Sequence, residues 1–309
     1  MLALPSVGMR KSKDKHNVDL ESLCDWIEGS VLFDSEVLSK SDFVDVLLEN
    51  EIYEDQDFAY EIIDNAWREI RRRLNWCGAS NPVDVLDRRM RPTQDWRDSS
   101  GHSFCIALAY AKWYPNWARA FGSDFNAQGD LFEAFTKEAL HIHFPDWEIH
   151  RTGWTRTHAS RLSNVVEEVA NRLGETIGDV DLWTDSTAHE AGLDIVCYRP
   201  FEDNRVGVPV FLLQCASGGN WESKLKTPDL DIWTKIILFA AAPKKAFAMP
   251  FSLSDTDFIR KCNLVNGMLL DRYRLLSAGR IKTDWLSAEL RDNIIAWLEP
   301  RIKLLPHAV

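Results

Sequence analysis

The runs Gly192-Leu193-Asp194-Ile195-Val196-Cys197-Tyr198 and Pro209-Val210-Phe211-Leu212-Leu213-Gln214-Cys215-Ala216-Ser217 decide the fold and carry its most unusual feature. Both are short, apolar and bounded by turn residues, which predicts two adjacent strands of one hairpin. An aspartate nevertheless stands inside the first run, and an amide follows four apolar residues in the second. Burying a polar group without a partner costs about 1–3 kcal/mol. The pattern therefore predicts a compensating partner for Asp194 and Gln214, and a divalent metal ion would serve both.

The composition is that of an ordinary globular protein, with 45% hydrophobic and 27% charged residues in a chain of 309. This length is sufficient for one large or two modest domains. The longest apolar run, 236–242, is too short to cross a bilayer, so we expect no membrane association. Six scattered cysteines show neither CxxC nor zinc-site spacing, which favours free thiols and a cytoplasmic location.

The net charge of −11 argues against a nucleic-acid partner until its distribution is considered. Sixteen acidic residues lie between Asn17 and Ile70, where Lys40 and Arg68 are the basic ones. The chain beyond residue 70 is close to neutral, which leaves room for a local basic groove. The acidic block itself is suited to recruiting a protein partner or to occupying such a groove.

The hydrophobic pattern predicts three parts: a flexible tail over 1–16, an acidic all-helical domain over 17–120, and an α/β domain over 121–309. In the last part the elements alternate between helix and strand, which favours a mixed central sheet flanked by helices. We expect helices over 129–143, 161–173, 230–242 and 287–298. We expect strands over 147–152, 245–250 and 268–276, in addition to the two quoted above.

The chemistry that suits these residues is phosphodiester hydrolysis assisted by Mg²⁺ or Mn²⁺. Mg²⁺ prefers oxygen ligands and retains several waters. Asp194 would supply the carboxylate, and Gln214 and the backbone carbonyl of Cys215 would complete the protein ligands. Glu133, on the helix over 129–143, would hold a metal-bound water. The metal would activate water and offset charge on the phosphate.

These stretches resemble the restriction-endonuclease-like superfamily, whose pattern is an Asp, a hairpin, then Glu or Gln-x-Lys, with a Glu on the first core helix. The likeness is greatest to the Mrr-like branch, through Gly192-Leu193-Asp194 and Gln214-Cys215-Ala216, and it covers about residues 125–277. It implies a restriction-endonuclease-like core and a magnesium-dependent endonuclease acting on DNA. The whole chain also resembles nuclease-like components of bacterial anti-phage defence systems, through its leading helical domain and the run 214–221.

The sequence departs from that family at the lysine position, which is Ala216. Lys224 or Lys226 would have to bring an ammonium back to the site and stabilise developing charge. Otherwise the domain is a catalytically degenerate adaptor that binds nucleic acid or a partner without cutting. A third reading, a metal-independent hydrolase with Cys215 as the nucleophile, lacks an evident histidine base.

Basic and aromatic residues also gather in the acid-free stretch 150–163, where Arg151, Trp154, Arg156 and Arg161 predict contact with a nucleic-acid backbone and stacking on a base. Simpler interpretations remain open for every candidate. This stretch would also suit a solvated loop, Asp194 a turn, and Gln214 a hydrogen bond across the sheet. Glu133 would also pair with Lys137, and Lys224 would also suit a solvated surface.

Overall fold

The structure is a computed structural model that describes residues 1–9, 18–78, 81–121, 124–152, 162–184 and 192–308. The chain forms two compact units. Unit 1 comprises Met1–Asp124, Pro250–Ser252 and Arg272–Val309, and unit 2 comprises Phe125–Met249 and Leu253–Asp271. Among the described residues, no helix is both long and apolar enough to cross a membrane.

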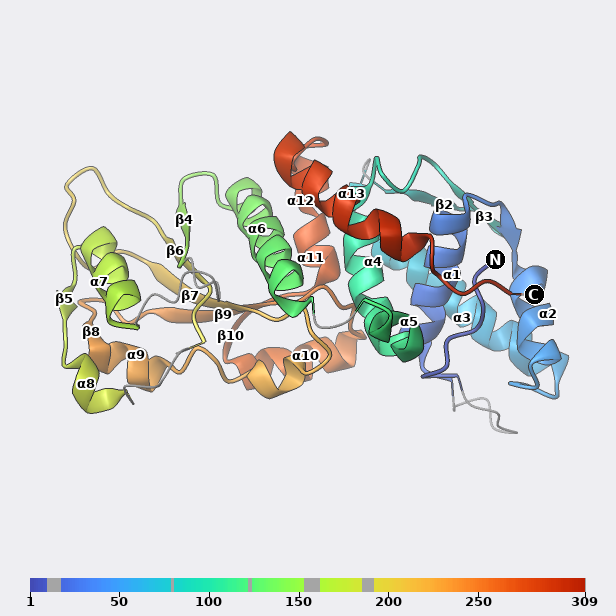
Figure 1. The fold of residues 1–309 in the computed structure, drawn as a ribbon, viewed down its shortest axis with the longest axis horizontal. Coiled ribbons are helices and arrows are strands. Elements are labelled where there is room, and N and C mark those ends of the chain that lie inside the picture. The colour runs from blue at the N-terminus through green and yellow to red at the C-terminus, as the bar shows by residue number, and fades with distance from the viewer. Residues whose placement is uncertain (10–17, 79–80, 122–123, 153–161, 185–191, 309) are drawn as a thin grey trace. The chain divides into compact units, whose positions relative to one another are not determined.

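Unit 1 is mainly helical (Figure 1). Its helices are α1 (Leu20–Asp34), α2 (Lys40–Glu49), α3 (Gln56–Leu74), α4 (Ser100–Trp113), α5 (Pro115–Arg119), α11 (Arg272–Leu276), α12 (Ala278–Ile281) and α13 (Ala288–Ile302). The expected all-helical domain is wrong in one respect, because unit 1 also holds a small antiparallel sheet. Its strands β1 (Leu38–Ser39), β3 (Arg89–Pro92) and β2 (Val83–Val85) lie in that order.

The C-terminal segment belongs to unit 1, although the sequence pattern assigned it to the α/β domain. The Phe104 ring of α4 meets the Trp297 ring of α13 edge-on, with centroids 5.3 Å apart. Arg301 forms an ion pair with Asp124, with 2.6 Å between nitrogen and oxygen. The amphipathic pattern of residues 287–298 shows that one face is buried, but it does not identify what covers that face.

The first residues are packed, in contrast to the flexible tail expected over 1–16. Leu2 is fully buried, its carbonyl accepts a hydrogen bond from Trp26 Nε1 at 2.9 Å, and it forms a β-bridge with His307. Residues 10–17, the remainder of the expected tail, lie outside the described part of the chain.

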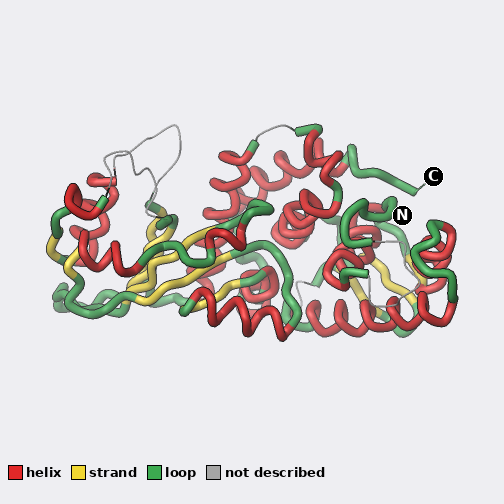
Figure 2. The backbone as a smooth tube through the Cα atoms, turned by 90° about the horizontal axis from the view of Figure 1, so that it is seen from below, coloured by secondary structure: helices red, strands yellow, loops and turns green. Residues whose placement is uncertain are grey.

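Unit 2 contains a mixed five-stranded sheet flanked by helices, as predicted. The strand order is β10 (Gly267–Leu270), β9 (Lys244–Ala248), β7 (Val210–Cys215), β6 (Ile195–Tyr198) and β4 (Glu148–Arg151). The β4, β6 and β7 strands pair antiparallel, whereas β7, β9 and β10 pair parallel. Figure 2 shows these strands side by side.

The helices of unit 2 are α6 (Phe125–His143), α7 (Leu162–Leu173), α8 (Val180–Trp183), α9 (Leu230–Ile236) and α10 (Asp255–Val265). Alternate β7 residues such as Leu212 face a core shared with Val166 of α7 and Trp233 of α9. The helix expected over 230–242 ends early, because Ile237–Leu238 (β8) turns extended and pairs with Thr176–Ile177 (β5). The strand expected over 268–276 likewise ends at Leu270, and α11 follows in unit 1.

Candidate functional site

The register of β6 and β7 brings Asp194 and Gln214 together. Ile195 pairs with Leu213, so Asp194, one residue earlier, stands opposite Gln214, one residue later. Gln214 Nε2 donates a hydrogen bond to Asp194 Oδ2, and the Cys215 backbone N–H donates to the same oxygen at 2.6 Å. The two polar side chains singled out in the sequence therefore lie on one side of the sheet and in contact.

The Gln214 amide occupies the point where the oxygen atoms of the site converge. Its Nε2 also donates to the Cys215 carbonyl at 3.0 Å, and its Oε1 accepts from Thr227 Oγ1 at 3.2 Å. The single Thr227 hydroxyl hydrogen has a shorter alternative acceptor, the Lys224 carbonyl, at 2.7 Å. Rotating the Gln214 amide by half a turn would exchange its Oε1 and Nε2 atoms. Nε2 would then donate to the Thr227 hydroxyl oxygen, and Oε1 would point toward Asp194.

After that half-turn, the site presents oxygen atoms from Asp194, Gln214 and the Cys215 carbonyl. Such a set fits Mg²⁺, which is usually held by one or two carboxylates with water and substrate phosphate completing its shell. Gln214 is 6% exposed, whereas Asp194 is partly exposed, which leaves an open side for those remaining ligands. In the part of the chain that the structure describes, no cluster of three His, Cys, Asp or Glu side chains is suited to hold a metal.

Gly192 permits this close packing. Its φ is +63°, a left-handed conformation that disfavours other residues. A Cβ at this position would lie 2.6 Å from Thr227 Cβ and 2.9 Å from Gln214 Oε1. The glycine therefore lets the chain enter β6 directly beside the amide.

Glu133 and Arg151, predicted to have separate roles, form an ion pair with each other. Arg151 Nη2 lies 3.0 Å from Glu133 Oε2 and 3.3 Å from Asp130 Oδ1. Arg151 is in register with Ile195, and side chains alternate along a strand, so this pair approaches from the face opposite Gln214. Glu133 would have to leave Arg151 to hold a water, and two carboxylates already neutralise Arg151 as a phosphate contact.

The Cys215 side chain is poorly suited to act as a nucleophile. Burial raises the pKa of its thiol well above the usual value, and the nearby Asp194 and Glu133 carboxylates raise it further. The thiol is therefore protonated at neutral pH. Its backbone carbonyl remains the part of this residue that could serve a metal.

Two lysines, Lys224 and Lys226, lie in the segment that follows β7. Lys224 ends the short helix η2 (Trp221–Lys224), and its carbonyl accepts from the Thr227 hydroxyl that contacts Gln214. Lys226 is exposed, and Ala216, where the restriction-endonuclease-like pattern would carry a lysine, is buried. The prediction that Lys224 or Lys226 supplies the missing cation stays a prediction.

Lys245 was missed in the sequence analysis. It is 8% exposed and donates to the Leu225 carbonyl at 3.3 Å. It stands two residues from Phe247, which pairs with Gln214, so both side chains share one face of the sheet. Burial lowers its pKa, Asp229 raises it, and Lys226 lowers it. A lysine inside the apolar strand 244–248 was the signal available in the sequence.

Trp154, Arg156 and Arg161, predicted to contact nucleic acid, lie outside the described residues. No protein-family model, curated protein or solved structure matches this chain.

Proposed function

We propose that this chain is a metal-dependent endonuclease with a restriction-endonuclease-like core, acting on DNA in bacterial anti-phage defence. The supporting observation is the convergence of the Asp194 carboxylate, the Gln214 side chain and the Cys215 carbonyl at a partly exposed point on neighbouring strands. When bound there, Mg²⁺ or Mn²⁺ would activate water and offset charge on the phosphate.

The residues of the chain have distinct roles in this proposal. Asp194 supplies the negative charge that holds the cation, and Gln214 adds a neutral oxygen whose orientation Thr227 fixes. Cys215 contributes its carbonyl. Glu133 positions water once it is released from Arg151, and that exchange could occur when a phosphate takes over the guanidinium.

A second candidate function is a nuclease-fold adaptor that binds nucleic acid or a protein without cleaving. Two observations favour it: Ala216 is 2% exposed where the family carries lysine, and Glu133 is tied to Arg151. The acidic N-terminal block would then serve as the surface for a protein partner.

Plasmid cleavage separates the two functions. Wild-type protein, Asp194→Asn and the matched control Asp146→Asn, an exposed aspartate of unit 2, are incubated with plasmid DNA and Mg²⁺ or Mn²⁺. Asn retains an oxygen for the Cys215 N–H, so the fold is kept while the charge is lost. We expect Asp194→Asn to lose about a hundredfold or more in rate and Asp146→Asn to match wild type.

Binding and an RNA substrate complete the experiment. Equal rates for wild type and Asp194→Asn would refute the catalytic role. Binding of labelled DNA without cleavage by any form would favour the adaptor. Metal-dependent cleavage confined to RNA would support the catalytic role and would refute DNA as the substrate.

A further inference from the structure

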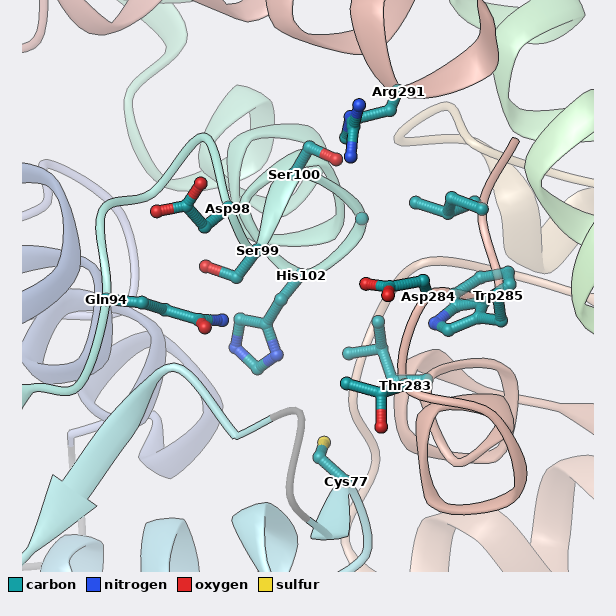
Figure 3. A pocket seen from close by; sticks show the side chains of 13 residues that line it. Cys77, Gln94, Asp98, Ser99, Ser100, His102, Thr283, Asp284, Trp285 and Arg291 are labelled. Carbon is teal, nitrogen blue, oxygen red and sulfur yellow. The ribbon is translucent and has the colours of Figure 1, made fainter. Parts of the chain in front are cut away.

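Unit 1 contains a polar cavity that the proposed nuclease chemistry does not use. Its volume is about 240 Å³, and it lies among the N-terminus of α4, Cys77 just beyond α3, and the segment Thr283–Leu286 between α12 and α13 (Figure 3). This volume is slightly below the roughly 300–1,000 Å³ typical of drug-sized ligand sites. The cavity is therefore suited to a small metabolite.

His102 supplies a buried hydrogen-bond acceptor to this cavity. Its side chain is 3% exposed, and its Nε2 is hydrogen-bonded to Oε1 of Glu28, which is fully buried. Glu28 Oε2 also accepts from the Tyr273 hydroxyl at 3.3 Å. A carboxylate that accepts from both neighbours places an imidazole hydrogen on Nε2, and in the neutral ring Nδ1 is then a hydrogen-bond acceptor.

That acceptor has no partner within the described part of the chain. A buried acceptor that receives no hydrogen bond costs about 1–3 kcal/mol, so a donor from a bound molecule would be favoured here. Figure 3 shows the imidazole among the lining side chains, between Gln94 and Thr283. The orphaned nitrogen is the observation that points to a ligand.

The remaining lining mixes donors and acceptors, which selects the chemistry of the ligand. Asp98 and Asp284 are acceptors, whereas Ser100, Thr283 and Arg291 offer donors. A hydroxyl group both donates and accepts, so several hydroxyls on one ligand match such a lining. The Trp285 indole adds an apolar wall.

Other ligand classes fit less well. The carboxylates of Asp98 and Asp284 against the single guanidinium of Arg291 disfavour an anion. Arg291 disfavours a simple polyamine. In the described ranges, no three metal-ligating side chains gather at this cavity or elsewhere.

We propose that unit 1 binds a neutral polyhydroxylated ligand, with one ligand hydroxyl donating to His102 Nδ1. The hydroxyls come either from a free monosaccharide or from the ribose of a nucleoside. The site is independent of the nuclease proposal and stands whether or not the chain cleaves DNA.

Saturation-transfer NMR on the full chain tests the proposal, with D-ribose, adenosine, putrescine and methyl phosphate as separate probes. Transfer to ribose supports the monosaccharide source, and transfer to adenosine alone supports the nucleoside source. Transfer only to putrescine or methyl phosphate, or to none of the four, would overturn the proposal.

Two variants locate the binding. His102→Gln keeps an Nε2 donor for Glu28 but removes the Nδ1 acceptor, and Asp284→Asn changes an exposed rim residue. Each should weaken binding about tenfold, whereas Asp45→Asn on the exposed side of α2 should not change it. Because Asp284 is exposed, its variant stays informative if His102→Gln unfolds. Unchanged binding in Asp284→Asn together with folded His102→Gln would place the ligand elsewhere and refute the assignment.

Discussion

Replacing Gln214 by Glu tests the geometry of the candidate metal site directly. The amide of Gln214 donates to Asp194 Oδ2 and to the Cys215 carbonyl, and a carboxylate can donate to neither. Two lost hydrogen bonds amount to about 1 kcal/mol each. Two unit charges about 4 Å apart repel by about 4 kcal/mol at an effective dielectric constant of about 20, and the partial exposure of Asp194 reduces this figure.

We therefore expect Gln214→Glu to lower the free energy of unfolding by about 3–5 kcal/mol at neutral pH in EDTA. The loss should shrink as the pH falls, because one of the two carboxyl groups then takes up a proton. It should also shrink with saturating Mg²⁺, because a second carboxylate binds the cation more tightly than the Gln214 amide does, and binding a hundredfold tighter than wild type adds about 2.7 kcal/mol to the stability of the variant. Urea unfolding followed by circular dichroism provides the measurement.

A double-mutant cycle isolates the contact. In an Asp194→Asn background, Gln214→Glu should lower the free energy of unfolding by about 2–3 kcal/mol less than it does in wild type, because the repelling Asp194 charge is gone. The same substitution combined with Asp146→Asn should show no coupling. If Gln214→Glu is as stable as wild type in EDTA, or if the Asp194 cycle shows no coupling, the side chains are not in contact and the metal site fails with them.

Two further predictions concern buried charges. Arg272 is fully buried and contacts Asp25 at 2.6 Å, so Arg272→Met should destabilise the protein by about 3–5 kcal/mol in urea unfolding. Arg91→Met, at an exposed pair with Asp84, should change stability by less than about 1 kcal/mol. Similar losses in Arg91→Met and Arg272→Met would contradict the burial of Arg272. Burial lowers the pKa of Lys245 in the folded protein below the usual lysine pKa, which applies to the unfolded chain. Between these two pKa values the unfolded chain binds more protons than the folded protein, so the free energy of unfolding should rise with pH. Lys245→Met should lack this rise, and parallel pH profiles for the two proteins would show that the lysine titrates normally.

The strands and the contact between Asp194 and Gln214 were predictable because apolar runs and hairpin register act over short distances. Because side chains alternate between the two faces of a strand, the register of two neighbouring strands is enough to place Asp194 opposite Gln214. The pairing of Glu133 with Arg151 was not predictable, because it joins a helix to an edge strand and depends on how α6 packs. Lys245 offered a readable signal, a cation inside an apolar strand, that the sequence analysis overlooked.

The placement of the C-terminal segment was also beyond the sequence pattern. Periodicity identifies which face of α13 is buried but not its partner, so residues 272–309 were assigned to the neighbouring α/β domain. His102 shows the same limit. A histidine in an apolar helix is usually a satisfied core residue, and only the surrounding packing reveals that His102 lines a cavity and that its Nδ1 lacks a partner among the described residues.

The Asp25–Arg272 ion pair joins residues 247 positions apart, which constrains how the protein matures on the ribosome. When Asp25 emerges from the exit tunnel, the guanidinium that neutralises it has yet to be synthesised, and the whole of unit 2 must be translated first. Unit 1 therefore cannot complete its interior during early translation, although amino-terminal domains commonly fold first. A nascent chain released near residue 124 would have the Trp113 Nε1 donor for Asp25 but no guanidinium to neutralise its charge, and it would be a natural substrate for chaperones and proteases.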